Sequence, residues 1–329
     1  MKWIRPSWIA LAALAATPLS AQEITLYSGR GESLVAPIIA AFEEQSGITV
    51  NVRYAGTAEL AVLLQEEGDA TPADLFWAQD AAALGAVVEM FAEMPEEVVE
   101  KVPAHLRDDG GRWVATSGRA RVIAYSPERF SEDEWPATMA ELTDERFRGR
   151  MALPPTTGSF QAHVTALRVV EGEDAAREWL EGIAANEPVI VSNNTAILQA
   201  IADGEADFGV TNNYYLGRFR TSDPEFPVEN GHFSQDGDIG NLLLVAGMGV
   251  MAASDNQDEA AEFVDFLLSP QAQQYFTGEV YEYPVTSGMI AQAGTPSLDD
   301  LDRIAPDVDL NAIGDLEGTL EMLREVGLL

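Results

Sequence analysis

Hydrophobic positions in the first part of the chain change repeatedly from strand spacing to helical spacing. Residues 23–27 (EITLY) fit a short strand, and residues 48–54 (ITVNVRY) alternate apolar and polar side chains as a strand does. Between them, apolar side chains recur at helical spacing up to Gly47: Leu34, Val35, Ile38, Ile39 and Phe42. A second helix is predicted over 58–68 and a third strand over 73–79. The pattern therefore predicts strands joined by helices.

The rest of the chain keeps this alternation. Further strands are predicted at 121–126, 150–154, 188–192, 206–211 and 241–252. Further helices are predicted at 161–172, 175–186, 194–204 and 257–276, and the acidic tail from Asp299 onward is again helical in its spacing. Strands separated by helices form parallel sheets with crossover helices. The predicted fold class is therefore α/β, without internal repeats or a low-complexity linker.

Residues 1–21 have the pattern of a secretory signal peptide. Lys2 and Arg5 precede an apolar run from Trp8 to Ala16, and small residues follow before a predicted cleavage site at Gln22. No later stretch reaches the roughly 18 apolar residues of a membrane span. Removing 21 of 329 residues leaves about 308, a length typical of about two domains. We therefore expect an exported, periplasmic chain with no direct membrane insertion.

Charge and composition exclude several classes of function. The formal charge of −35 becomes −37 once the two cationic residues of the signal peptide are removed, so nucleic acid and anionic lipid are not expected partners. Cysteine is absent, which excludes disulfides, thiolate metal sites and a thiol nucleophile. The three histidines, at 105, 163 and 232, lack the paired spacing of a zinc site.

Two adjacent tyrosines, Tyr214 and Tyr215, follow the predicted strand at 206–211. A phenol loses its proton near pH 10, so only a strongly polarising cation binds it at neutral pH, and hard cations prefer oxygen ligands. Neighbouring side chains of a strand point to opposite faces. The pair can therefore reach one ion only if the strand has already ended in a turn or a helix start. Packing of the two rings in core and surface is the commoner role of such a pair.

The order of several segments resembles the periplasmic ferric-iron-binding proteins that feed ABC importers. The segments are LYSGRGESLVAPIIAAFEEQSGITVNVRYAG, TPADLFWAQD, SGRARVIAY, PTTGSF, NNTAILQAIADGEADFGVTNNYY and AAEFVDFLLSPQAQQYF. The resemblance implies a type II periplasmic binding protein, with two α/β lobes joined by hinge strands around a ligand cleft. Its implied divisions are a first lobe over 22–122, a second over 123–246, and a return to the first lobe with C-terminal helices over 247–329.

The resemblance also implies a set of site residues. Tyr214 and Tyr215 match the iron ligands of that family. A synergistic anion, carbonate or phosphate, would be held by residues at helix starts, where backbone N–H groups favour anions; the matching residues are Thr157, Gly158, Ser159, Asn194 and Asn212. Simple helix capping is the alternative role for Asn194.

The first lobe departs from the family pattern. Gly31 stands where members commonly have a histidine, Gln79 where some have a glutamate, and Phe160 where others have a further tyrosine. Glu32 and Asp80 are the neighbouring candidates for hard oxygen ligands, together with Gln79 itself. A solvated acid in the first turn of a helix is the alternative role for Glu32, and a helix cap is the alternative for Asp80.

Three arginines are candidate anion partners in a chain that has few cations. Arg30, Arg119 and Arg121 could each hold an anion in the cleft through a bidentate contact. Arg119 and Arg121 are two positions apart, so they share one face of the predicted strand. Ion pairs with some of the 54 acidic residues are the alternative.

The sequence thus predicts a periplasmic binding protein, not an enzyme, that captures ferric iron with a synergistic anion. It would act as a monomer that delivers iron to an ABC importer permease. One rival is a receptor of the same fold for an organic anion or amine, such as a phosphonate, thiamine or a polyamine, with Trp77 and Tyr54 lining an aromatic slot. An exported hydrolase is the other rival, but no Ser or Cys nucleophile with a nearby base is evident.

Overall fold

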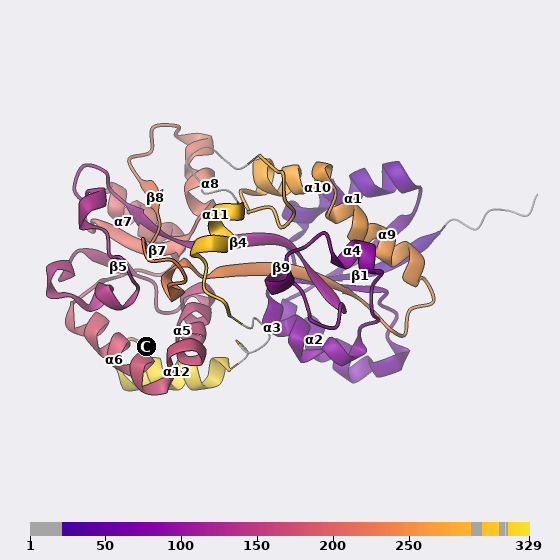
Figure 1. Cartoon of the computed structure of the whole chain (residues 1–329), viewed down its shortest axis with the longest axis horizontal. Helices are drawn as coiled ribbons and strands as arrows, with labels where there is room; N and C mark the ends of the chain where they lie inside the picture. Colours follow the sequence, from indigo (N-terminus) through magenta and orange to yellow (C-terminus); the bar gives the residue numbers. More distant parts are fainter. Residues whose placement is uncertain (1–21, 291–297, 309–312, 314) are drawn as a thin grey trace, which may run out of the picture.

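Two α/β lobes lie side by side and are joined by long strands that run from one to the other (Figure 1). The computed structural model describes residues 22–290, 298–308, 313 and 315–329. The expected signal peptide, residues 1–21, lies outside the described residues. None of the helices in the described part of the chain is long and apolar enough to cross a membrane.

One continuous nine-stranded sheet passes through both lobes in the order β2-β1-β3-β9-β4-β7-β5-β6, with β8 paired to β4. The strands are β1 Glu23–Ser28, β2 Thr49–Tyr54, β3 Leu75–Ala78, β4 Trp113–Tyr125, β5 Met151–Leu153, β6 Val189–Ile190, β7 Phe208–Asn212, β8 Glu229–Gly231 and β9 Leu243–Val250. The outer strands of each lobe pair in parallel, and the shared strands β4 and β9 pair antiparallel with their neighbours. The predicted α/β class with parallel strands is therefore confirmed in both lobes.

Strands β4 and β9 form the connection between the lobes. The first part of β4 pairs with β9 up to Ala120, and from Arg121 onward β4 pairs with β7 of the second lobe. A single 13-residue strand therefore changes partner at Ala120 and Arg121. This change of partner marks the crossing from one lobe to the other.

Helices cover both faces of the sheet in each lobe (Figure 1). They are α1 Glu32–Ser46, α2 Thr57–Glu67, α3 Ala81–Ala86, α4 Glu96–Val99, α5 Gly158–Glu171, α6 Glu173–Ala185, α7 Asn194–Ala202, α8 Tyr214–Ser222, α9 Gln257–Leu267, α10 Pro270–Tyr275, α11 Leu298–Ile304 and α12 Leu316–Glu325. The helix predicted over 257–276 is in fact two, because Ser269 caps a new helix that starts at Pro270, which has no N–H to continue the first.

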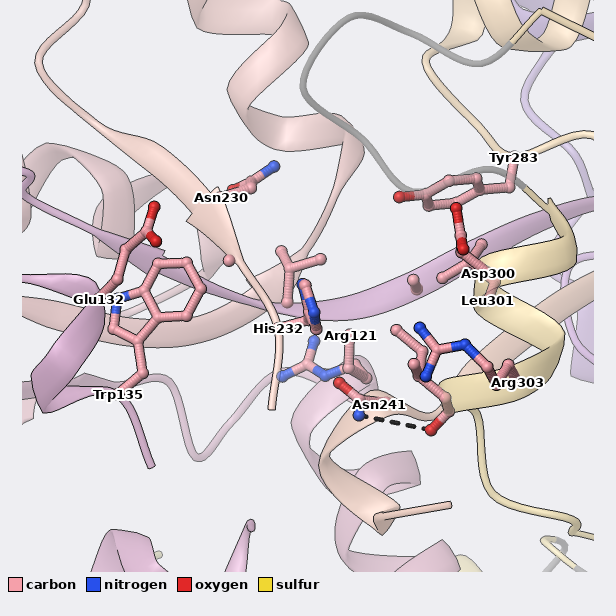
Figure 2. A pocket seen from close by; sticks show the side chains of 14 residues that line it. Arg121, Glu132, Trp135, Asn230, His232, Asn241, Tyr283, Asp300, Leu301 and Arg303 are labelled. Atoms are coloured by element: carbon pink, nitrogen blue, oxygen red, sulfur yellow. Dashed lines mark hydrogen bonds between the residues drawn. The ribbon is translucent and has the colours of Figure 1, made fainter. Parts of the chain in front are cut away.

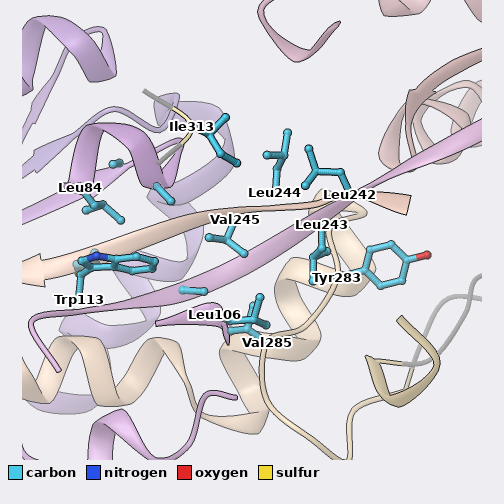
Figure 3. Close-up of a cluster of buried hydrophobic side chains, with 14 of the residues drawn as sticks. Leu84, Leu106, Trp113, Leu242, Leu243, Leu244, Val245, Tyr283, Val285 and Ile313 are labelled. Carbon is cyan, nitrogen blue, oxygen red and sulfur yellow. The ribbon is translucent and has the colours of Figure 1, made fainter. Parts of the chain in front are cut away.

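The apolar core continues along the shared strands. Figure 3 shows buried side chains on both sides of β4 and β9, including Trp113 of β4 and Val245 of β9. Tyr283 and Val285, which follow α10 in sequence, belong to the same cluster. The hydrophobic effect therefore fixes the connecting strands as well as each lobe.

The last helix of the chain packs on the second lobe. Thr319 of α12 lies 2.7 Å from the hydroxyl of Thr165 in α5, and Arg168 of α5 donates to Asp315 and Thr319 at 2.7 and 2.8 Å. Charge-assisted bonds of this kind are stronger than neutral ones. The C-terminal end thus closes over the outer face of α5 (Figure 1).

A buried ion pair links the end of β1 to the segment after α10. Arg30 donates to Glu282 through two nitrogens, at 3.0 and 2.8 Å, and Ser117 of β4 donates to the same carboxylate at 2.5 Å. Burial alone would raise the pKa of Glu282, but the charge and hydrogen bonds of Arg30, together with Arg119 and Ser117, hold that pKa below its usual value. Glu282 is therefore ionised in the folded protein.

We predict that Arg30→Met destabilises the fold by about 3–5 kcal/mol, because it leaves the carboxylate of Glu282 buried without its cation. Urea denaturation of the metal-free protein at neutral pH measures this loss. Because the folded-state pKa of Glu282 is lowered, the contribution of the pair is present at neutral pH and is lost as the pH falls through that folded-state value.

The double variant Arg30→Met with Glu282→Gln removes both charges and is the matched control. Its loss of stability should be clearly smaller than that of Arg30→Met alone. A double variant as unstable as the sum of the two single changes would contradict the assignment.

Candidate functional site

A cleft of about 840 Å³ lies between the lobes, and three helices of the second lobe begin at its wall. These helices are α5, α7 and α8, which contribute Gly158 and Ser159, Asn193 and Asn194, and Tyr214 and Tyr215. The first-turn N–H groups and the positive end of each helix dipole are therefore directed toward one cavity. Ligands of open α/β sheets bind at such strand ends.

The tyrosine pair lies where a strand becomes a helix. Strand β7 ends at Asn212, and α8 begins at Tyr214. Successive side chains therefore no longer alternate between faces, and the two hydroxyl oxygens lie 3.3 Å apart in a hydrogen bond. The expectation that the strand ends before the pair is confirmed. Both rings line the cleft and are only partly buried.

An asparagine amide reaches each phenol oxygen. Asn212 donates to the hydroxyl of Tyr214 at 3.3 Å, and Asn194 donates to the hydroxyl of Tyr215 at 3.5 Å. Burial raises the pKa of Tyr215 to about 12, and the neighbouring phenol of Tyr214 acts in the same direction, whereas the amide of Asn194 acts against it. At neutral pH this phenol therefore keeps its proton until a cation displaces it.

Arg121 orients the side-chain amide of Asn212. It donates to Asn212 Oδ1 at 2.8 Å, so the amide nitrogen of Asn212 is turned toward Tyr214. Arg121 also donates to Nδ1 of His163 at 3.3 Å, and His163 Nε2 therefore carries the proton and donates to the carbonyl of Ile239 at 2.7 Å. Burial, and then the charge of Arg121, lowers the pKa of His163 to about 3, so the imidazole stays neutral.

The predicted anion-binding turn lines the same cleft. Thr157 caps α5 by accepting from the N–H of Phe160 at 3.4 Å, which leaves the N–H groups of Gly158 and Ser159 at the open end of the helix. Ser159 accepts from Asn194 at 2.8 Å. The capping role weighed for Asn194 was wrong: Asn193 caps α7, and the side chain of Asn194 is directed to the cleft instead.

Arg119 is a cationic side chain that lines the cleft between the lobes. Its side chain is buried, and Nη1 has no hydrogen-bond partner within the described part of the chain. Burial lowers the pKa of Arg119, although the nearby Glu282 and Tyr214 act in the opposite direction. A buried guanidinium with an unpaired nitrogen favours an anion beside it.

Arg218 was not predicted from the sequence. It lies over both tyrosine rings, with its guanidinium carbon 4.5 Å from the centre of Tyr214 and 5.6 Å from that of Tyr215. Arg218 follows Tyr214 by four residues and Tyr215 by three, so it lies on the same face of the helix. This spacing was the signal in the sequence from which its contact with the rings could have been predicted. A cation at this place stabilises negative charge on either phenol.

The wall from the first lobe is mostly apolar. Small side chains of α2 and α3 form most of it, with Gln65, Gln79 and Asp80 as polar members. Asp80 accepts from the N–H of Ala83 at 3.0 Å and so caps α3, as the alternative reading of Asp80 predicted. Gln79 accepts from Arg30 at 3.2 Å. Glu32 is exposed at the start of α1, and neither it nor Arg30 lines the cleft.

The aromatic slot proposed for an organic ligand is not formed. Trp77 is fully buried and donates to Thr116 at 2.9 Å, and neither Trp77 nor Tyr54 lines the cleft. Phe160, at the family's further tyrosine position, is buried and packs near Trp179. The sequence could not show whether Trp77 lines a ligand slot or packs in the core, because strands covered on both faces are apolar throughout.

A second hollow of about 440 Å³ lies elsewhere, and Figure 2 shows its lining side chains, among them Trp135, His232 and Arg303. Arg121 lines this hollow, although its guanidinium bonds to Asn212 of the cleft. The two cavities share no lining residue. Arg121 therefore supports the tyrosine site from outside the cleft.

The cleft can hold a small hard cation through oxygen atoms. No group of three or more His, Cys, Asp or Glu side chains suited to a metal exists among the described residues, so the phenols are the ligands at hand. With metal–oxygen distances of about 2 Å, neighbouring ligands of an octahedral cation lie about 3 Å apart. The 3.3 Å between the two phenol oxygens is close to this spacing.

Solved structures with the same architecture hold iron. Iron-bound HitA of Pseudomonas aeruginosa aligns with a TM-score of 0.80 and 30% identity, over 93% of this chain and 99% of that one. The Trichodesmium protein IdiA (FutA), in complex with iron and citrate, aligns with a TM-score of 0.80 and 26% identity over the same shares. The fold and the two lobes are thus shared.

Sequence relatives agree with the structural ones. The chain is 31% identical to the major ferric iron-binding protein of Neisseria meningitidis, over 99% of this chain and 98% of that protein. It is 34% identical to iron uptake protein A1 of Synechocystis, over 90% and 86% of the two chains. Residues 70–306 match the family described as bacterial extracellular solute-binding protein. With its two lobes, its cleft and these relatives, the chain belongs to the bacterial extracellular solute-binding proteins, in the group whose relatives are ferric iron-binding proteins.

Proposed function

We propose that this protein captures ferric iron between its lobes, with Tyr214 and Tyr215 as protein ligands, and delivers it to the permease of an ABC importer. The observation that carries the proposal is the pair of phenol oxygens 3.3 Å apart on the cleft wall. Ferric iron is a hard cation, and oxygen ligands suit it. Its charge favours the deprotonated phenols, which Arg218 and the two amides then stabilise.

A synergistic anion completes the site in this proposal. The open first turn of α5 at Gly158 and Ser159, with Thr157, Asn194 and Asn212 around it, offers neutral donors, and Arg119 adds a buried charge. Carbonate or phosphate is the proposed anion. Citrate accompanies iron in the Trichodesmium relative and is a third anion to compare.

The first lobe contributes no metal ligand in this proposal. Asp80 is occupied as the cap of α3, Gln79 is bonded to Arg30, and Glu32 lies outside the cleft. The rest of that wall is apolar except for the neutral amide of Gln65. Anion and water oxygens therefore fill the other positions on the metal, and the first lobe closes over the site to exclude solvent.

The role is that of a periplasmic carrier without catalytic activity, acting as a monomer. We propose lobes over 22–122 and 123–246, a segment 247–329 that returns to the first lobe and ends in C-terminal helices, the last of which packs on the second lobe, and export by the segment 1–21. The change of partner of β4 at Ala120 and Arg121 supports the first boundary within two residues. Hinge motion about β4 and β9 would give the permease a closed, iron-loaded shape to recognise.

Our first prediction for this function concerns the phenols. Protein loaded with ferric citrate in the presence of bicarbonate should show a visible phenolate-to-iron charge-transfer band. Tyr214→Phe and Tyr215→Phe should each weaken the band strongly and lower iron affinity at least tenfold, or about 1.4 kcal/mol, because each removes one anionic ligand. A colourless wild type that binds no ferric iron with bicarbonate, phosphate or citrate would refute the proposed function.

Proton release supplies the control for this prediction. A phenol with its ordinary pKa near 10 keeps its proton at neutral pH, so each phenol that binds iron must release one. With the same iron reagent, each Tyr→Phe variant should release about one proton fewer per bound iron than the wild type. Equal release in the wild type and both variants would exclude the phenols as ligands.

Closure generates the next prediction. Saturating iron should lower the radius of gyration in solution scattering and raise the melting temperature, since a ligand at 100 times its Kd adds about 2.7 kcal/mol to folded-state stability. The Tyr214→Phe, Tyr215→Phe double variant should show neither effect. Unchanged scattering and melting of the wild type would argue against a cleft site.

Substitutions at Asp80 test the proposal that the first lobe contributes no metal ligand. Asp80→Asn keeps a good capping side chain but removes the charge, so iron affinity should stay within about threefold and stability should be nearly unchanged. Glu32→Ala should be equally neutral, whereas Ser159→Ala or Asn212→Ala should weaken iron binding. A loss of tenfold or more in folded Asp80→Asn, measured by competition with citrate, would show that the carboxylate binds the metal.

A further inference from the structure

Residues 281–283 connect three parts of the molecule near the tyrosine site. They follow a π-helical turn, Phe276–Val280, that continues α10. Tyr281 has φ 63° and ψ 24°, in the left-handed region. Glu187 is the only other non-glycine residue with positive φ among those the structure describes. A bulky side chain rarely adopts this backbone conformation unless its surroundings fix it.

The ring of Tyr281 lies against α8, the helix that begins with the tyrosine pair. A Cβ atom added to Gly217 would lie 2.3 Å from Cδ1 and 2.7 Å from Cγ of that ring. Glycine inside a helix is less favourable than alanine, so its presence here has a packing reason. Gly217 follows Tyr214 by three residues, so the ring touches α8 one turn beyond the tyrosines.

The hydroxyl of Tyr281 fixes the same helix further along. It lies 2.7 Å from Oγ1 of Thr221, and Thr221 itself donates to the carbonyl of Gly217 at 3.1 Å. Because the proton of Thr221 is used in that bond, Tyr281 is the donor between the two hydroxyls. The ring and the hydroxyl thus contact two successive turns of α8.

The backbone of Tyr281 holds the start of α8. Its carbonyl accepts from Asn213 Nδ2 at 2.9 Å, and Asn213 Oδ1 accepts from the N–H of Ala120 in β4 at 3.1 Å. Asn213 is buried and directly precedes Tyr214. One side chain therefore joins the shared strand, Tyr281 and the first residue of the tyrosine helix.

The two residues that follow anchor the segment on its other side. Glu282 is paired with Arg30 at the end of β1, and Tyr283 exchanges two backbone hydrogen bonds with Gly118 of β4, at 2.7 and 2.8 Å. Tyr281 is therefore held by the first lobe and the shared strand while its side chain is held by the second lobe. Tyr281 therefore links the two lobes directly.

We infer that Tyr281 is a positioning residue for the tyrosine pair: its ring on Gly217 and its bond to Thr221 set where α8, and with it both phenol oxygens, stand relative to the first lobe. The inference rests on the proposed function, because the phenols matter as iron ligands. It adds a residue that touches neither metal nor anion and that determines how rigidly the two ligands are held.

Three variants test the inference from both sides of the contact. Gly217→Ala pushes the ring away, Tyr281→Gly removes the ring while keeping the left-handed backbone, and Tyr281→Phe keeps the ring but loses the bond to Thr221. Gly182→Ala is the matched control: it is also a helix glycine, its Cβ would lie 2.7 Å from Thr143 Cγ2, and it is remote from the cleft.

The readouts are the charge-transfer band of the ferric protein and the rate of iron release to a competing chelator. Gly217→Ala and Tyr281→Gly should shift or halve the band and speed release at least tenfold, with a smaller effect in Tyr281→Phe. Gly182→Ala should stay within twofold of the wild type in release even if its melting temperature falls. Folded Gly217→Ala and Tyr281→Gly that release iron within twofold of the wild type, with an unchanged band, would overturn the inference.

Hydrogen exchange of the metal-free protein separates this inference from the proposed function. If the wild type shows no iron band, the proposed function fails. Amide exchange then still tests whether Tyr281 positions α8. Amides of α8 should then exchange at least tenfold faster in Gly217→Ala and Tyr281→Gly than in the wild type and Gly182→Ala. Exchange of α8 that is the same in all four proteins would overturn the inference in that case.

Discussion

The change from strand to helix between Asn212 and Tyr214 is the constraint on which the site depends. In a longer strand the two tyrosines would point to opposite faces of the sheet, and no single ion could reach both. In a helix start, adjacent side chains converge, and the phenol oxygens lie 3.3 Å apart. The same junction brings Asn212, the last residue of β7, beside Tyr214, and Arg121 fixes its amide from β4.

The two lobes contribute different groups to the cleft. The second lobe supplies the tyrosines, both amides and the starts of three helices, so it forms a polar half-site by itself. The first lobe supplies a mostly apolar wall and the anchor for the segment after α10. An apolar wall that closes on a charged site lowers the local dielectric and strengthens each charge interaction there. In the proposed site, the first lobe would therefore act by excluding solvent and not by supplying a ligand.

Much of the fold followed from periodicity, because parallel strands and amphipathic helices differ clearly in spacing. The tyrosine pair was predicted as iron ligands through the family resemblance, and the locally predicted end of the strand at 206–211 showed how the two rings could converge. Local signals were insufficient elsewhere: Asn193 and Asn194 are chemically equal candidates for the cap of α7, and only the geometry separates them. Arg30 and Glu282 are 252 positions apart, so no sequence spacing could pair them. Trp77 fits a core strand and an aromatic slot equally well until its neighbours are known.

Anomalous diffraction at the iron absorption edge, from crystals grown with ferric citrate and bicarbonate, tests the central claim most directly. The account predicts one strong peak in the cleft, within about 2 Å of the hydroxyl oxygens of both Tyr214 and Tyr215 and without a carboxylate of the first lobe among its ligands. A peak bonded to only one tyrosine, or to Asp80 in place of them, would contradict it.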